Sequence, residues 1–122
     1  MILDLLKALG GLAETNFVVR NADALSELLG PLRVTEEGGW ATLERECCPC
    51  HIHLRLEQMA EARFVQERGF SPGVQASSVQ FFHVNGDRPV LTVYLPEPGY
   101  LEVQGRFGGQ ERMLFGRGAG IP

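Results

Sequence analysis

The sequence predicts an α+β domain: an antiparallel sheet of about seven strands, built from hairpins and partly covered on one face by two N-terminal helices. Three observations support this prediction. Leucines recur at helical spacing near the N-terminus, apolar and polar residues alternate from residue 32 onward, and turn-forming residues separate the β-rich runs. A chain of 122 residues has room for one domain and is too short for two. We expect one domain over 1–122, with a helical lead-in over 1–30, the sheet over 32–103 and a loose glycine-rich tail over 104–122.

Two helices are expected in the lead-in. Within residues 1–14, apolar side chains three or four positions apart form one stripe, which ends near Gly10. After a short β-branched run over 17–20, Asn21 can cap a second helix, because its side chain can accept the first free backbone N–H groups. The buried stripe of that helix would consist of three leucines, Leu25, Leu28 and Leu29.

Two turns define the clearest hairpins. Gly38 and Gly39 separate two short runs whose apolar residues alternate. Farther along, Asn85-Gly86 lies between the β-rich runs 77–84 and 88–95 and supplies the residues that a type I′ turn needs for positive φ. Each pair therefore predicts two adjacent antiparallel strands.

Two segments are harder to assign. Residues 57–68 contain Glu, Gln, Ala and Arg, which favour a helix, yet the run 63–66 is typical of a strand. Pro96 and Pro98 end the predicted sheet, and residues 100–103 are expected to add a short edge strand.

The strand predicted from His51 to Leu56 alternates strictly between apolar and polar side chains. Because successive side chains of a strand point to opposite faces, its residues divide into two sets. The apolar set is Ile52, Leu54 and Leu56, and the polar set is His51, His53 and Arg55. Both histidines are therefore expected on one face.

Composition excludes several classes of protein. The net charge is −4 and the isoelectric point is near 5.3, the wrong sign for a protein that neutralises nucleic-acid phosphates. No apolar run approaches the roughly 20 residues that span a bilayer, and Asp4 stands where a signal peptide has a basic region. We expect a cytoplasmic protein with neither nucleic acid nor membrane as its partner.

The three cysteines lie within four positions, at Cys47, Cys48 and Cys50. Such crowding cannot cross-link distant parts of a chain, so a disulfide scaffold is excluded and reduced thiols are expected. With His51 and His53 they place five potential ligands in seven residues, a set suited to zinc, copper or iron. A closed zinc site usually takes ligands from two separated pairs, and the chain has no second cysteine pair.

The same segment has other interpretations. Cys47-x-x-Cys50-His51 has the spelling of the c-type haem attachment motif, although such attachment normally occurs in exported proteins. A Cys-Pro-Cys element beside histidine can also hold a thiolate or a strained disulfide. Finally, the cysteines can be small side chains beside a sheet with no chemistry of their own.

The run from His51 to Leu95 resembles the haem-iron utilisation family of intracellular haem carriers, the HemS/ChuX/HutX-like proteins. The resemblance rests on a His-Ile strand, a second strand ending in Glu-Arg, a loop, and two hydrophobic strands joined by Asn85-Gly86. It implies that residues 59–66 are a strand preceded by a hairpin turn at Glu57-Gln58. It also implies that His51 occupies the position of a haem-binding histidine.

Two departures from the family pattern affect the expected site. The region 35–45 lacks the second histidine that members often carry, and the usual C-terminal helix is expected to be replaced by the glycine-rich tail. Ligation of haem iron would then be single-sided at His51, use His53 instead, or be lost.

The resulting hypothesis is non-catalytic binding of haem or a related tetrapyrrole, for transfer or storage. His51 would be the iron ligand and His53 a neighbouring donor or alternate ligand. Arg63 and Arg88 would pair with the haem propionates, and Phe82 would form an apolar wall.

Alternatives remain at this point. One is a zinc- or copper-binding protein that uses Cys47, Cys48, Cys50, His51 and His53, and another is a structural domain without a ligand of its own. A haem-opening enzyme is a further alternative, but no catalytic constellation is visible.

The strand edges of so small a sheet also favour a homodimer.

Overall fold

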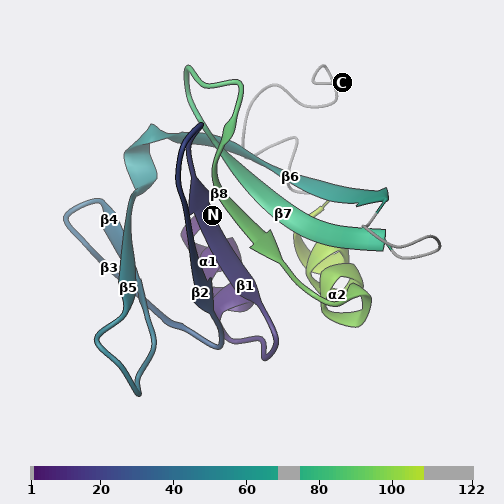
Figure 1. The fold of residues 1–122 in the computed structure, drawn as a ribbon, viewed down its shortest axis with the longest axis horizontal. Coiled ribbons are helices and arrows are strands. Elements are labelled where there is room, and N and C mark those ends of the chain that lie inside the picture. Colours follow the sequence, from purple (N-terminus) through teal and green to yellow (C-terminus); the bar gives the residue numbers. More distant parts are fainter. Residues whose placement is uncertain (1, 69–74, 109–122) are drawn as a thin grey trace.

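The computed structural model describes residues 2–68 and 75–108, which form eight strands and two helices (Figure 1). In chain order the elements are α1 (Ile2–Gly10), β1 (Asn16–Arg20), β2 (Leu25–Leu29), β3 (Arg33–Glu37), β4 (Trp40–Glu44), β5 (His51–Arg55), the 3-10 turn η1 (Leu56–Gln58), β6 (Met59–Arg68), β7 (Gln75–His83), β8 (Pro89–Tyr94) and α2 (Glu97–Phe107).

The strands form two antiparallel sheets where the sequence predicted one sheet of about seven strands. The five-stranded sheet has the order β2-β1-β8-β7-β6, and the three-stranded sheet has the order β3-β4-β5. The expected hairpin turn at Glu57-Gln58 is wrong, because β6 pairs with β7 and η1 carries the chain from one sheet to the other. The α+β class, the antiparallel pairing and the strand over 59–66 are confirmed.

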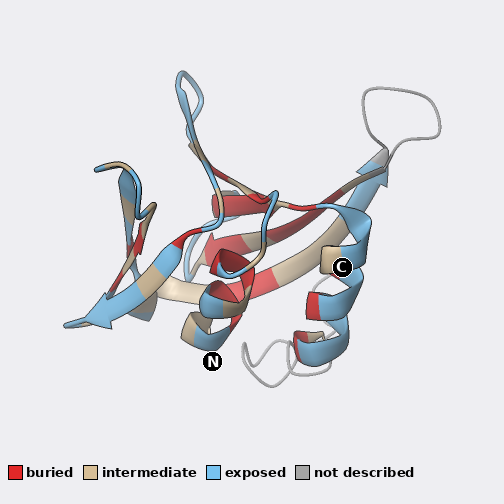
Figure 2. Cartoon of the chain, turned by 90° about the horizontal axis from the view of Figure 1, so that it is seen from below, coloured by how far each residue is buried: buried red, intermediate tan, exposed pale blue. Residues whose placement is uncertain are grey.

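One apolar core joins both sheets and both helices. The predicted N-terminal helix is confirmed as α1, which buries Leu5, Leu6 and Leu9. These leucines belong to the same cluster as buried residues of the two sheets. Figure 2 shows α1 between the three-stranded sheet and α2, with both helices on the same side of the five-stranded sheet. Each sheet therefore has one face toward the core and one face turned away from it.

The predicted second N-terminal helix is wrong, because its leucines lie on strand β2. Asn21 does cap backbone N–H groups, accepting from those of Asp23 and Ala24 at 2.8 and 2.9 Å, but it thereby closes a turn. β2 then pairs along its whole length with β1. Of the three leucines only Leu28 faces the core, so pairing with β1 outweighs the helical spacing.

The predicted edge strand over 100–103 and the loose tail from residue 104 are also wrong in the described part of the chain, because helix α2 continues to Phe107. The helix tolerates Pro98 in its first turn, where no backbone N–H partner is needed. Three of its side chains share a buried face at helical spacing, Tyr100, Val103 and Phe107. The expected absence of a C-terminal helix is thereby corrected. Residues 109–122 lie outside the described residues.

The two predicted turns have different outcomes. Gly38 and Gly39 join β3 to β4 with φ of 61° and 86°, as a two-residue turn requires. Asn85 and Gly86 do join two paired strands, but neither has positive φ, so the type I′ assignment is wrong. The connection is a longer loop over 84–88, in which the Gly86 N–H donates to the His83 carbonyl at 3.0 Å.

Neither described helix has the length and apolar character needed to cross a membrane.

Candidate functional site

The outward face of the three-stranded sheet carries both predicted histidines. Cross-strand partners share a face, and the register places three residues in each row across β3, β4 and β5. The rows are Arg33, Glu44 and His51; Thr35, Thr42 and His53; and Glu37, Trp40 and Arg55. The opposite face buries Ala41, Leu43 and Leu54 in the core. We call these nine outward residues the histidine face.

His51 and His53 are both exposed, and their ring centroids are 4.7 Å apart. The prediction that they point to the same side is confirmed. Each ring is held through its Nδ1 atom. His51 Nδ1 lies 3.3 Å from the Pro49 carbonyl oxygen, and His53 Nδ1 lies 3.0 Å from the Thr42 hydroxyl.

The contact to Pro49 determines the tautomer of a neutral His51. A carbonyl oxygen can only accept a hydrogen bond, so Nδ1 of His51 carries the hydrogen and donates it. The lone pair of a neutral ring is then on Nε2. Within residues 2–68 and 75–108, His51 Nε2 has no hydrogen-bond partner. Imidazoles that ligate metals are commonly oriented in this way, with the other ring nitrogen donating to a carbonyl.

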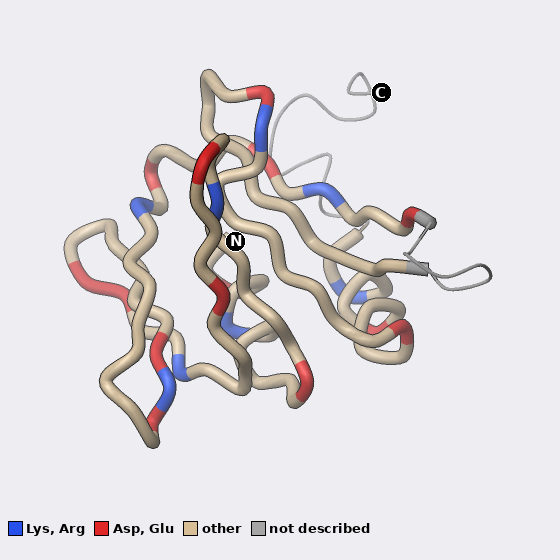
Figure 3. The backbone as a smooth tube through the Cα atoms, in the orientation of Figure 1, with Lys and Arg blue, Asp and Glu red and all other residues tan. Residues whose placement is uncertain are grey.

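An aromatic ring and two guanidinium groups lie on the same face. Trp40 is 43% exposed, and the Arg55 guanidinium lies 5.0 Å from its ring centroid. Arg33 forms a 2.8 Å salt bridge with Glu44, which raises the pKa of Arg33 and keeps it charged. Positive and negative residues are interspersed along the chain in Figure 3. The histidine face thus combines two imidazoles, an exposed indole and two cations.

The three cysteines lie in the β4–β5 turn, residues 45–50, which the Arg45 N–H closes by donating to the Cys50 carbonyl at 3.2 Å. The sulfurs of Cys47 and Cys48 are 3.0 Å apart. A hydrogen bond from Cys48 and the charge of Arg45 lower the pKa of Cys47, and the same hydrogen bond with burial raises the pKa of Cys48.

The cysteines and histidines do not converge into a metal centre. No group of three or more His, Cys, Asp or Glu residues in the described part of the chain is arranged to hold a metal ion. The zinc or copper alternative therefore has no support.

Two other predicted site residues, Arg63 and Phe82, lie on the five-stranded sheet. The Arg63 guanidinium lies 4.2 Å from the Phe82 ring centroid and forms a 2.8 Å salt bridge with Glu61. Phe82 and Glu61 are buried, at 3% exposure each. Arg88 is exposed in the loop over 84–88. The structure thus divides the predicted haem residues between the two sheets and the loop over 84–88.

Sequence reasoning did not include Trp40, Thr42 and Arg33 in the site. A signal for them was present, because Trp40 and Thr42 alternate with buried residues after the Gly38-Gly39 turn. The missing information was the β4–β5 register, which sets Thr42 opposite His53. An irregular six-residue turn does not fix that register in the way a two-residue hairpin turn does.

Residues 2–106 match the haem utilisation ChuX/HutX family. The chain belongs to this family. A comparison with curated proteins finds no match.

Solved structures share the fold. The haem-binding protein ChuX aligns with a TM-score of 0.70 at 14% identity, covering 86% of this chain and 71% of ChuX. ChuS, a haem oxygenase of E. coli, aligns with a TM-score of 0.73 at 25% identity, covering 87% of this chain and 33% of ChuS. Holo-PhuS, a haem-binding protein from Pseudomonas aeruginosa, aligns with a TM-score of 0.65 at 18% identity, covering 84% of this chain and 31% of PhuS.

Proposed function

We propose that this chain binds haem without catalysing its conversion, for transfer or storage in the cytoplasm, and that His51 on the histidine face ligates the iron. Membership of the haem utilisation ChuX/HutX family supports the ligand class, as does the similarity to ChuX and PhuS, which are haem-binding proteins. The single observation that carries the site assignment is the orientation of His51, whose Nδ1 donates to the Pro49 carbonyl.

The chemistry of the histidine face fits haem. Haem iron accepts a neutral imidazole as an axial ligand, and the tautomer assigned to His51 offers Nε2 for that bond. The macrocycle is flat and apolar, and the exposed Trp40 indole offers a matching surface. The propionates are anionic, and guanidinium groups bind carboxylates well. His53, with its ring centroid 4.7 Å from that of His51, is the neighbouring donor or alternate ligand.

We assign the propionate contacts to Arg55 and Arg33 in preference to Arg63 and Arg88. Arg55 and Arg33 share the histidine face with His51, whereas Arg63 packs on Phe82 in the other sheet. Arg63 forms its salt bridge with a buried carboxylate, Glu61, against a buried ring, Phe82, so its role is better explained as structural.

The exposed edge of the five-stranded sheet supports a homodimer. β2 is an edge strand, and an edge presents unpaired backbone N–H and C=O groups to a partner. Leu25 and Leu29 on this strand are 54% and 57% exposed. We propose that a second copy covers them, and light scattering of the wild type and a Leu25→Glu/Leu29→Glu variant tests this. A dimer that becomes a monomer in the variant would support the proposal, and a monomeric wild type would contradict it.

The function is tested by titrating purified apo-protein with haemin and following the Soret band. We expect saturable binding near one haem per chain that persists when all three cysteines are changed to serine. The serine variant is the control for thiol ligation and covalent attachment. A nonspecific, unsaturable rise in the wild type would contradict haem binding, and loss of binding in the serine variant would assign the iron to the thiols.

A further inference from the structure

The β4–β5 turn places two thiols in contact at the surface. Cys47 and Cys48 are adjacent in the chain, and their sulfurs lie 3.0 Å apart. This separation is about 1 Å longer than a disulfide bond, so the two sulfurs are already neighbours. Cys50 makes no such sulfur contact in the described part of the chain.

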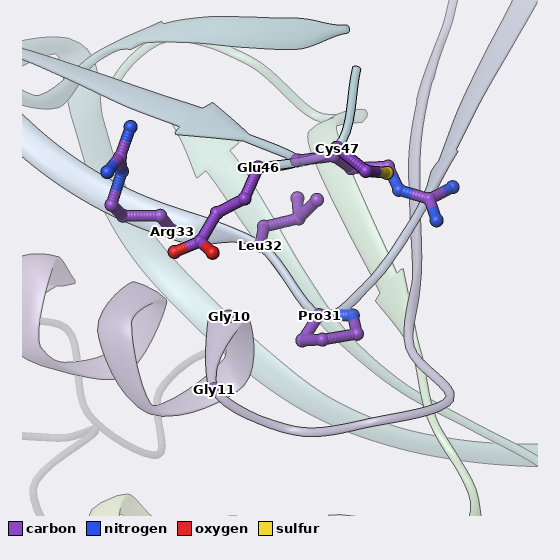
Figure 4. Close-up of a pocket in the computed structure, with 8 residues that line it drawn as sticks. Gly10, Gly11, Pro31, Leu32, Arg33, Glu46 and Cys47 are labelled. Carbon is purple, nitrogen blue, oxygen red and sulfur yellow. The ribbon is translucent and has the colours of Figure 1, made fainter.

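Cys47 is accessible to a small reagent. It is exposed and lines a cavity of about 360 Å³ that opens between the C-terminal end of α1, residues 31–33 and the β4–β5 turn. Figure 4 shows Cys47 and Glu46 along one side of this cavity, across from Gly10, Gly11 and Pro31. Cys48 is only half-exposed.

The surroundings assign different roles to the two thiols. The hydrogen bond from Cys48 and the positive charge of Arg45 lower the pKa of Cys47, so Cys47 supplies more of the nucleophilic thiolate. The pKa of Cys48 is raised, so it is the better proton donor of the pair. The positive charge of Arg45 lowers the pKa of both thiols, and the other side chains that shift these pKa values are neighbouring cysteines.

We propose that Cys47 and Cys48 are a reversible oxidation site at which a low-molecular-weight disulfide converts the thiol pair into a vicinal disulfide. The Cys47 thiolate attacks one sulfur of the reagent, which forms a mixed disulfide and releases one thiolate. The Cys48 thiol then loses its proton and attacks the Cys47 sulfur, which forms the Cys47–Cys48 bond and releases the second thiolate. The protein loses two electrons and two protons, and the reagent disulfide is reduced to two thiols.

Reversibility follows from the adjacency of the two residues. Consecutive Cα atoms are about 3.8 Å apart, which is shorter than the roughly 4.4 Å that disulfides normally need. A vicinal disulfide is therefore strained, and strained, exposed disulfides are the readily reduced kind. The site lies within the turn that also supplies the Pro49 carbonyl to His51, but the oxidation itself does not depend on haem binding.

The experiment exposes the reduced full-length chain to oxidised glutathione and follows it by intact mass and thiol alkylation. We expect the wild type to lose two hydrogen atoms in mass and two alkylatable thiols, with full reversal by dithiothreitol. The Cys50→Ser variant should behave in the same way, because Cys50 is not part of the proposed bridge.

The other two variants separate the proposed roles. Cys48→Ser should stop at a glutathione adduct on Cys47, and Cys47→Ser should react about tenfold more slowly because the activated thiolate is gone. The proposal would be overturned if Cys50→Ser formed no internal disulfide, if the wild type gave only glutathione adducts, or if the chains became linked to one another.

Discussion

The outward faces of the two sheets differ in how far their side chains are buried. On the three-stranded sheet, His51, His53 and Arg55 are exposed, and polar groups meet solvent across the face. On the five-stranded sheet, Phe82 and Glu61 are buried at 3% exposure although they point away from the core that α1 and α2 cover.

This difference separates side chains that solvent can reach from side chains that are packed. The carboxylate of Glu61 and the guanidinium of Arg63 form their salt bridge against the buried ring of Phe82. The imidazoles of His51 and His53 are each oriented by one hydrogen bond at Nδ1, and both residues are exposed. The three-stranded sheet therefore presents exposed groups that a ligand can reach, whereas the corresponding groups of the five-stranded sheet are packed against one another.

The largest expected effect is on stability, in Phe82→Ala. We expect the free energy of unfolding to fall by about 3 to 5 kcal/mol, because a buried aromatic ring is removed. Urea denaturation followed by circular dichroism measures it. The milder Phe82→Leu variant should fold and bind haemin like the wild type. Loss of haemin binding in folded Phe82→Leu would move the haem site to the five-stranded sheet and break the comparison.

The contact between α1 and the three-stranded sheet is tested by Gly10→Ala. A Cβ atom at Gly10 would lie 2.7 Å from the Leu32 carbonyl oxygen and from Val34 Cγ2, so backbone must shift. We expect a loss of about 1 to 3 kcal/mol in unfolding free energy. Gly105→Ala is the matched control, because a Cβ there meets nothing within 4 Å, and it should gain up to about 1 kcal/mol of helix stability. Equal effects of the two substitutions would contradict the close packing at Gly10.

Trp40→Ala separates binding from stability on the histidine face. The indole is exposed and contacts Arg55, so the unfolding free energy should change by less than about 0.5 kcal/mol. Haemin affinity should fall by roughly fivefold, about 1 kcal/mol, because an aromatic surface for the macrocycle is lost. The measurement is a haemin titration followed by absorbance at the Soret band, which does not depend on tryptophan fluorescence. Unchanged affinity would exclude Trp40 from the haem contact.

The smallest effect is expected for Thr42→Val, which removes the hydroxyl that holds His53 Nδ1 at 3.0 Å. We expect about a twofold loss of haemin affinity, because one exposed hydrogen bond contributes little. A loss larger than that of His51→Ala would make His53 the principal iron ligand.

The sequence predicted local features that depend on near neighbours. Helix α1, the strand nature of His51–Arg55 and the shared side of its two histidines follow from periodicity alone. Strand β2 was missed because pairing with β1, and not the spacing of its leucines, determines its structure. Helix α2 was missed because residues 100–103 were interpreted as an edge strand and the glycine-rich residues after them as a loose tail, whereas Pro98 lies in the first turn of a helix, where proline is tolerated.

The candidate site was predicted only in part for a similar reason. His51 and His53 lie on one strand, so alternation placed them together. The separation of Arg63 and Phe82 from the histidines depends on η1, which carries the chain from one sheet to the other. No local sequence pattern indicates that the chain passes from one sheet to the other at this point.

The most direct test of the account compares the haemin affinity of His51→Ala with that of His83→Ala, since the chain has three histidines and His83 lies on β7 of the other sheet. We predict at least about a tenfold loss for His51→Ala, equivalent to about 1.4 kcal/mol, and an unchanged affinity for His83→Ala. Equal affinities in the two variants, or a greater loss in His83→Ala, would contradict the assignment of the haem site to the histidine face.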